Sequence, residues 1–345
     1  MKWRAPADGG DPPARSEPFQ RNRSRNGVSP AGTLFAAARV MTRRRIIVPG
    51  TTWALSRRTT RRYFLLNPDQ ARELEQCYWY CLGLAAQRFG LIVHAGCLMS
   101  THSHEVVTDV CGVLPRFLQE FHRLLALTTK ALRGWPGEVF DKRSTGQHAL
   151  LTPEATIEAL AYLIANPVEA GAVRYASDWP GAHTLPRDIG ARLVKVKRPS
   201  HYFDPDNADW PDMLELRLEI PTELELDYGI ELAQQRIAAR VKEREHRAWQ
   251  ESKRTGIAFA GARRVLRQTH TKRARSYEVF GSLNPRFAAA GHRGAAAEAV
   301  RRLRAFNAQY DKALAAWSTG KRTVCFPSGT WWMRVCHGAR CGPAP

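Results

Sequence analysis

Two apolar stretches joined by a two-residue turn constrain the fold of this chain most strongly. Leu91–Met99 has the sequence LIVHAGCLM, His102–Val110 has the sequence HSHEVVTDV, and Ser100-Thr101 lies between them. Short runs rich in β-branched and apolar residues on either side of a tight polar turn predict an antiparallel β-hairpin. Because successive side chains of a strand point to opposite faces, residues two apart on either strand share a face.

Amphipathic patterns of helical length stand on both sides of this β-hairpin. The first follows Asn67–Gln70, where asparagine is a good N-cap and the next residue is a proline that suits the first helical turn, and it ends at Gly90. The second runs from Leu114 to Gly134 with apolar residues at intervals of three and four. Each pattern predicts a helix with one apolar stripe.

Weaker patterns complete the order of elements. Thr51–Arg57 predicts a strand, and a further strand is expected within Val139–Leu151. Thr152–Glu154 opens a helix that should end near Asn166, because Pro167 disfavours helical geometry in the residue before it. The predicted order is therefore β-α-β-β-α-β-α.

This order predicts an α+β fold. Its first six elements match the ferredoxin-like (split βαβ) arrangement, an antiparallel sheet with the β-hairpin at its centre and helices on one face. Residues 186–345 are predicted to form a basic, mainly helical C-terminal extension. Residues 1–40, rich in Pro, Gly, Ser and Arg, are predicted to form a flexible basic leader, or to be an overextended start. Such a fold serves many functions, so function has to be argued from a site.

The charge balance suits a polyanionic partner. The chain has 52 Lys and Arg against 32 Asp and Glu, a formal net charge of +20. Each phosphate that a cation neutralises releases counterions, which favours nucleic acid, although the arginine-rich composition of a high-GC genome would give the same excess. The seven cysteines lack metal-finger spacing, and no apolar run approaches the roughly 20 residues of a membrane span. We therefore expect a cytoplasmic protein with no membrane partner.

Two short patterns carry chemistry. His102 and His104 share a face of the second hairpin strand, where two imidazoles can present nitrogen ligands to a divalent metal; otherwise they are half-polar side chains on a tolerant strand. Tyr162 and Asn166 share a face of the last helix at i, i+4 spacing, outside its apolar stripe. Taken alone, they describe a surface tyrosine and an asparagine that ends a helix.

Together the two patterns resemble those of a known family. The segments CLMSTHSHEVVTD (Cys97–Asp109) and AYLIANPVEAGAV (Ala161–Val173) are similar to the C-L-M-x-x-H-x-H-x-x-V strand and the Y-x-x-x-N-P-V-x-A-G helix end of the single-tyrosine HUH transposases, particularly the REP-associated tyrosine transposases. The resemblance covers roughly residues 41–185, including the opening RRRIIVPGTTW and the trailing SDWPGAH.

The resemblance implies that residues 41–185 are the catalytic domain of a DNA transposase. His102, His104 and Asn166 would hold Mg²⁺ or Mn²⁺, and Tyr162 would be the nucleophile that cleaves and rejoins single-stranded DNA at hairpin sites. A metal would withdraw charge from the phosphate oxygens. A covalent 5′-phosphotyrosine would conserve the energy of the broken bond, so that the released 3′-hydroxyl can reverse the step without ATP.

Two residues depart from the family pattern. Ser103 and Glu105 stand where apolar residues are usual. If both face the helix layer, each costs about 1–3 kcal/mol unless it finds a partner. Glu105 would then pair with an arginine or join the metal environment, or the domain would have lost activity.

Basic residues around the first strand suggest contacts with single-stranded or hairpin DNA, through phosphate pairing and stacking on Trp53, and the alternative is a solvated charged rim. They are Arg43, Arg44, Arg45, Arg57, Arg58, Arg61 and Arg62. The basic segment Arg263–Arg275 would extend this footprint along a DNA stem, and a homodimer is compatible with the sequence. Two rival functions stay open: a domesticated, non-catalytic regulator that binds hairpin DNA or RNA, and a metal-dependent nuclease that uses water.

Overall fold

The structure is a computed structural model that describes residues 44–141, 145–274 and 286–343. The predicted leader, residues 1–40, and Arg43 lie outside the described residues. None of the helices in the described ranges combines the length and apolarity that a membrane span requires.

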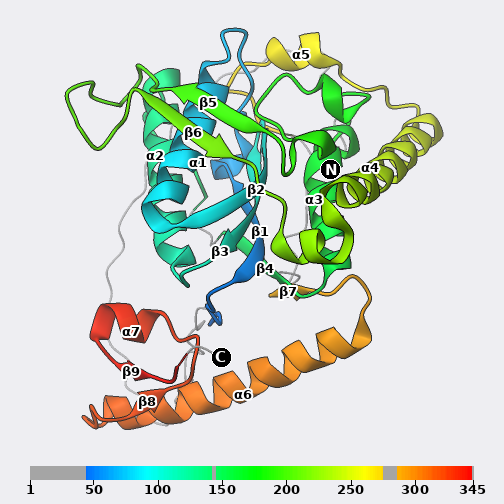
Figure 1. Ribbon diagram of the computed structural model, residues 1–345. Coiled ribbons are helices and arrows are strands. Elements are labelled where there is room, and N and C mark those ends of the chain that lie inside the picture. The colour runs from blue at the N-terminus through cyan, green and yellow to red at the C-terminus, as the bar shows by residue number, and fades with distance from the viewer. Residues whose placement is uncertain (1–43, 142–144, 275–285, 344–345) are drawn as a thin grey trace, which may run out of the picture. The chain divides into compact units, whose positions relative to one another are not determined.

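A mixed five-stranded sheet organises the fold (Figure 1). Its strands run in the spatial order β2-β3-β1-β4-β7, where β1 is Thr51–Arg58, β2 is Leu91–Met99, β3 is His102–Asp109, β4 is Gly146–Leu150 and β7 is Phe287–Ala288. β1 is antiparallel to both β3 and β4, and β2 is antiparallel to β3, whereas β7 joins parallel to β4. The protein is therefore an α+β fold.

The described ranges contain the following further elements. The helices are α1 (Glu73–Phe89), α2 (Leu114–Arg133), α3 (Pro153–Glu169), α4 (Thr222–Thr255), α5 (Ala262–Leu266), α6 (Arg293–Ser318) and α7 (Trp332–His337), with short 3-10 turns η1 (Thr60–Arg62), η2 (Ala176–Asp178) and η3 (Pro186–Asp188). The remaining strands are β5 (Leu193–Lys197), β6 (Met213–Arg217), β8 (Cys325–Phe326) and β9 (Arg340–Cys341).

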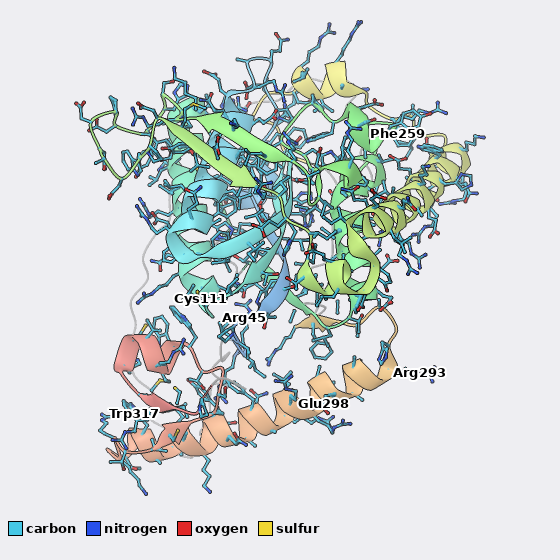
Figure 2. The ribbon with its side chains drawn as sticks, viewed as in Figure 1. Arg45, Cys111, Phe259, Arg293, Glu298 and Trp317 are labelled. Atoms are coloured by element: carbon cyan, nitrogen blue, oxygen red, sulfur yellow. The ribbon has the colours of Figure 1, made fainter. Side chains whose placement is uncertain are left out.

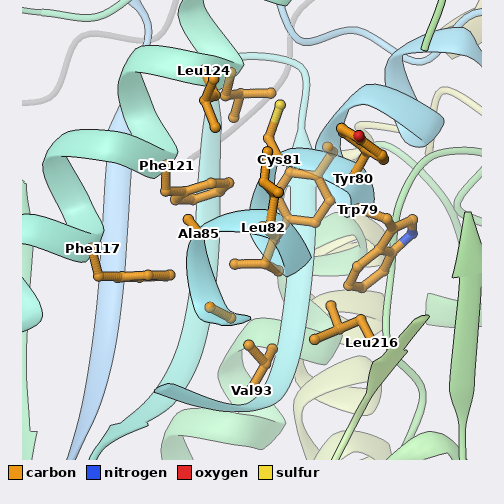
Figure 3. Close-up of a cluster of buried hydrophobic side chains, with 14 of the residues drawn as sticks. Trp79, Tyr80, Cys81, Leu82, Ala85, Val93, Phe117, Phe121, Leu124 and Leu216 are labelled. Carbon is orange, nitrogen blue, oxygen red and sulfur yellow. The ribbon is translucent and has the colours of Figure 1, made fainter. Parts of the chain in front are cut away.

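Helices cover both faces of the sheet: α1 and α2, the two helices of the first six elements, share one face as expected, and α3, the seventh element, covers the other. α1 and α2 pack on one face, where Figure 3 shows Leu82 and Phe121 in one cluster of buried side chains with Val93 of β2. α3 packs on the other face against Val106 of β3. The physical reason is that β3 carries apolar residues at the successive positions Val106 and Val107, which point to opposite faces, so both faces need a covering layer.

The β-hairpin is not at the centre of the sheet as a unit. β3 lies inside, paired on one side with β2 and on the other with β1, but β2 is at the end of the strand order. β1 rather than β2 has two strands of the sheet on each side. The histidine-bearing strand is nevertheless an interior strand, and its backbone is held by hydrogen bonds on both edges.

Two helix ends differ from the predicted ones. α1 begins at Glu73 and not near Asn67, because the carboxylate of Asp69 accepts a hydrogen bond from the Glu73 amide at 2.9 Å and so caps the helix. α3 continues through Pro167 to Glu169. Proline only disfavours helical geometry in the residue before it, and the burial of this last turn in the core offsets that preference.

The described residues beyond 185 belong to the same compact unit as the sheet. β5 and β6 form an antiparallel hairpin whose apolar face packs on α1, and α4 packs along α3. Phe259, in the segment after α4, packs against the cluster around α3 (Figure 2). The C-terminal part therefore contributes strands as well as helices. Its elements β5, β6 and α4 share the two clusters that cover the sheet, whereas α6, β8 and α7 bury their apolar residues in a separate cluster around Phe326 and Met333.

Candidate active site

Four of the predicted site residues converge on the α3 face of the sheet. His102 and His104 project from β3 with their ring centroids 4.8 Å apart, and Tyr162 and Asn166 lie one turn apart on α3. The alternation of side chains along β3 puts both imidazoles on the face that α3 covers. The structure thus brings together the two patterns that are far apart in the sequence.

The side-chain amide of Asn166 bridges the two imidazoles. Its Oδ1 lies 3.2 Å from Nε2 of His102, and its Nδ2 lies 3.4 Å from Nε2 of His104. The other ring nitrogen of His102 meets the Thr101 hydroxyl at 3.0 Å, and the His104 ring also hydrogen bonds to the Leu55 backbone. These outer partners orient the rings so that both Nε2 atoms point at the same amide.

Both imidazoles are held in the neutral form near pH 7. Burial lowers the pKa of His102 to about 4, and the positive charges of Arg58 and Arg62 add to this lowering. Burial and the neighbouring His102 place the pKa of His104 well below its ordinary value. A neutral imidazole is the form that binds metals, so no proton has to leave before a cation arrives.

The donor set fits a divalent cation. Two neutral imidazole nitrogens and one amide oxygen lie within hydrogen-bonding reach of each other, and imidazole and carbonyl oxygen are both ligands for ions such as Mn²⁺. In the described part of the chain, no group of three or more His, Cys, Asp or Glu is arranged to hold a metal. The histidine–asparagine set is of another composition, since its third member is an amide.

Tyr162 lies beside this set and remains accessible. The residue is 40% exposed, and its ring meets that of His104 edge-on, with centroids 5.4 Å apart and an interplanar angle of 82°. The guanidinium of Arg244, from α4, lies 5.4 Å from the centroid of the Tyr162 ring. Arg244 is held there by Glu169 at 2.8 Å and Glu158 at 3.0 Å, both on α3.

A cavity of about 330 Å³ opens next to the tyrosine. Its walls include His104 from β3, His148 from β4, Glu158 and Tyr162 from α3, and Ala290, which follows β7. The cavity gives a small polar group access to Tyr162 and to the His104 imidazole at once. Because β7 belongs to the C-terminal part, the site is completed by residues that lie beyond the predicted catalytic segment.

No protein-family model and no curated protein matches this chain. Part of it resembles a solved transposase. That structure is of a REP-associated tyrosine transposase bound to a REP hairpin; it is 21% identical over 43% of this chain and 85% of the other, with a TM-score of 0.36. A likeness this distant carries no argument about activity, so function has to be argued from the site itself.

Ser103 and Glu105 face α1 and α2, away from the histidines. Oε1 of Glu105 accepts a hydrogen bond from the Tyr78 hydroxyl at 3.2 Å, while within the described ranges the Glu105 Oε2 and Ser103 Oγ atoms meet no partner at hydrogen-bonding geometry. Burial raises the pKa of Glu105 to about 8, and the neighbouring Ser103 and Tyr78 offset only part of this rise. Among the residues that the structure describes, the Glu105 side chain neither pairs with an arginine nor joins the candidate metal ligands.

Glu105→Gln is expected to flatten the pH dependence of stability. The Glu105 carboxyl loses its proton near pH 4.5 in the unfolded chain but only near pH 8 in the folded protein. The wild-type carboxyl therefore contributes stability that is fully present below pH 4.5 and is lost as the pH rises to about 8. The loss reaches about 5 kcal/mol at most. Urea unfolding at pH 5 and pH 8 measures it. The exposed Glu215→Gln serves as a control, and parallel losses in wild type and E105Q would contradict the assignment.

The predicted DNA-binding residues fall into separate groups. The indole of Trp53 is only 3% exposed and packs between the sheet and the α1–α2 layer, so the expectation that it stacks on bases is wrong. Its position on β1 puts it on the face opposite the histidines. Arg45 and Arg57 are on that same opposite side, where they donate hydrogen bonds to the backbone oxygens of Thr145 and Asp141.

Three of the other predicted arginines, at and just after the end of β1, lie nearer the candidate site. Arg58 pairs opposite His102 in the β1–β3 register and points to the α3 face. Arg61 and Arg62 follow at once in η1, where Arg61 is exposed and Arg62 is half-buried. Arg44, at the start of the described residues, is half-buried. The arginines beside the site are thus those at the end of β1, because a strand alternates its side chains between faces.

Sequence reasoning missed the residues that surround Tyr162 from other elements. Arg244 lies in a long charged helix, where nothing in the pattern distinguishes it from its neighbours. Glu158 stands one turn before Tyr162, and that i, i+4 spacing was a usable signal. Ala290 had no signal at all, because its place beside the tyrosine depends on β7 pairing with β4.

Proposed function

We propose that this chain is a DNA transposase that cleaves and rejoins single-stranded DNA at hairpin sites, with Tyr162 as the nucleophile. The observation that carries the proposal is the contact of the Tyr162 ring with His104, one helical turn from the amide that bridges both imidazoles. A nucleophile beside a metal-ligand set, at the edge of an open cavity, is what phosphoryl transfer requires.

The proposal includes the ferredoxin-like (split βαβ) reading of the first six elements, with a DNA partner and Mg²⁺ or Mn²⁺. The order β2-β3-β1-β4 with antiparallel neighbours throughout supports that reading. His102, His104 and Asn166 would hold the cation, which supplies charge withdrawal from the non-bridging phosphate oxygens. A homodimer and a cytoplasmic location stay predictions from the sequence.

The protein's own residues account for the proposed step. The hydroxyl oxygen of Tyr162 forms a bond to phosphorus while the bond from phosphorus to the 3′-oxygen breaks, and the phenolic proton ends on that 3′-oxygen. The 5′-phosphate stays on Tyr162, so attack by a 3′-hydroxyl reverses the step and rejoins a strand. Arg244 and its two carboxylates hold the phenol ring in place, and Arg58 beside His102 attracts the phosphate.

Covalent trapping tests the proposal. The protein is incubated with Mn²⁺ and a pool of DNA hairpins that have randomised loops and flanks, labelled at either the 3′ or the 5′ end. We expect a denaturation-resistant adduct that carries only the 3′ label, since the tyrosine keeps the 5′-phosphate of the downstream segment. Chelation of the Mn²⁺ should prevent formation of this adduct. Cleavage with no adduct would favour the water-dependent nuclease. Binding with no cleavage would favour the non-catalytic regulator.

A further inference from the structure

A basic segment from the C-terminal part returns to the end of β1. Residues 261–273 run along the loop that follows η1: the Phe64 amide donates to the Lys272 carbonyl at 2.8 Å, and the Ala274 amide donates to the Arg62 carbonyl at 3.1 Å. Tyr63 and Arg273 form an isolated β-bridge between these two hydrogen bonds. Two basic stretches that are some 200 residues apart in the chain are therefore joined side by side through their backbones.

Buried Asn67 fixes this segment to the β-hairpin that carries the histidines. Its side-chain Nδ2 donates to the carbonyls of Val265 at 2.9 Å and Gln268 at 3.1 Å, at α5 and just after it. Its Oδ1 accepts from the hydroxyl of Ser100, in the turn that leads into His102, at 2.8 Å. The segment is thus a rigid wall beside the candidate site, since one buried amide holds both parts.

Exposed cations on this wall have no carboxylate partner. Within the described ranges none of the following forms a salt bridge: Arg61, Arg263, Arg267, Lys272 and Arg273. Arginines on nearby helices behave differently, since Arg72 pairs with Glu75 at 2.7 Å on α1 and Arg254 pairs with Glu251 at 2.7 Å on α4. Like charges left together repel and disfavour the folded state unless a polyanion neutralises them.

Aromatic rings lie among these cations. Tyr63 meets Trp135, which follows α2, with ring centroids 4.9 Å apart, and Trp135 meets His270 at 6.5 Å. The guanidinium of Arg273 lies 5.2 Å from the Tyr63 ring centroid. All three rings are half-buried, so each keeps part of its surface accessible. Cations interleaved with aromatic rings match the chemistry of a nucleic-acid strand, whose phosphates pair and whose bases stack.

We infer that these residues form a binding surface for single-stranded DNA. The basic–aromatic surface consists of Arg61, Tyr63, Trp135, Arg263, Arg267, His270, Lys272 and Arg273. Its η1 end adjoins the candidate site, because the buried Thr59 amide, just before η1, donates to the Thr101 carbonyl next to His102. The strand bound here is the one that Tyr162 attacks, and this assignment of the strand's fate rests on the proposed function. Binding itself does not depend on Tyr162.

Fluorescence anisotropy with a dT20 oligonucleotide tests the surface. The triple variant Arg263→Gln, Arg267→Gln, Arg273→Gln is expected to bind dT20 at least about 10-fold more weakly than wild type. For this variant, the slope of log binding constant against log salt concentration should be less steep by about 2. Each lost phosphate contact with a single strand lowers the slope by about 0.7, and the variant loses three. The matched control, R301Q/R302Q/R304Q on α6, removes the same three charges and should change both quantities little. Equal losses in both triple variants would overturn the proposal.

A second variant reports on stacking alone. Trp135→Leu keeps the charge and is expected to weaken dT20 binding about 5- to 10-fold with an unchanged salt slope. A single variant, R273Q, keeps the test valid if the triple variant melts earlier than wild type, and its slope should fall by about 0.7. Unchanged binding by R273Q and W135L, or no binding of dT20 by wild type, would overturn the surface.

The outcomes separate this inference from the proposed function. If wild type forms the covalent adduct and the surface variants bind dT20 as tightly as wild type, the surface is wrong and the transposase proposal stands. If the surface variants lose binding and wild type forms no adduct, the surface stands as a single-strand binding site and the transposase proposal is wrong.

Discussion

Tyr162→Phe is expected to abolish the covalent protein–DNA adduct and to lower strand cleavage at least about 1000-fold, as the loss of a nucleophile does in other covalent enzymes. The substitution removes one oxygen atom and nothing else. The ring should keep its edge-on contact with His104 and its place beneath Arg244, since both involve the ring and not the hydroxyl. Adduct yield and single-turnover cleavage with the labelled DNA hairpins measure the effect.

DNA affinity should be almost unchanged in this variant. The basic–aromatic surface and the end of β1 do not include Tyr162, so binding of the same hairpins should fall less than about 3-fold, within the range of an altered surface residue. Tyr175→Phe is the matched control. Tyr175 is 43% exposed, and this substitution removes the same hydroxyl oxygen at a position away from the histidines. Adduct formation by Y162F at the wild-type level would exclude Tyr162 as the nucleophile.

His104→Gln is expected to weaken Mn²⁺ binding about 100-fold or more. Loss of an outer partner of a metal ligand already lowers metal affinity 10- to 100-fold, and His104 would be a ligand itself. Glutamine keeps a polar side chain that can still accept from the Asn166 amide, so the fold should tolerate it. The electron paramagnetic resonance signal of free Mn²⁺ gives the affinity directly, with no reliance on activity.

A surface histidine supplies the control for this measurement. His201 lies in the loop between β5 and β6, where it contacts Glu73, and it is far in the chain from the candidate ligands. His201→Gln should bind Mn²⁺ as wild type does. If H104Q and wild type bind the ion equally, the histidine pair is not the metal site, and the proposed chemistry would need another source of charge withdrawal.

The hydrophobic pattern predicted most elements of the sheet domain. β2 matches the predicted Leu91–Met99, and α2 ends before Gly134 as expected. α3 buries the predicted apolar stripe and leaves Tyr162 outside it. These are local properties: an apolar residue every second or every three to four positions is sufficient to specify a strand or a helix and the face that it buries.

The layers of the fold were harder to predict. A strand that is apolar on both faces, such as β3, needs cover on both, but its sequence does not say which helix covers which face. The C-terminal part showed the same difficulty, because strand β7 has two residues and joins the sheet only through pairing with β4. Pairing between distant segments depends on the whole chain and leaves no local pattern.

The sequence by itself determined which residues this protein has for chemistry: two imidazoles on one face of a strand, and a tyrosine with an asparagine on one face of a helix. Only the tertiary structure decided that these faces meet, that Asn166 bridges the histidines, that Glu105 meets Tyr78, and that Trp53 lies on the face opposite the histidines. The periodicity of a strand or helix fixes relative directions within one element, whereas the meeting of two elements depends on packing across the whole core.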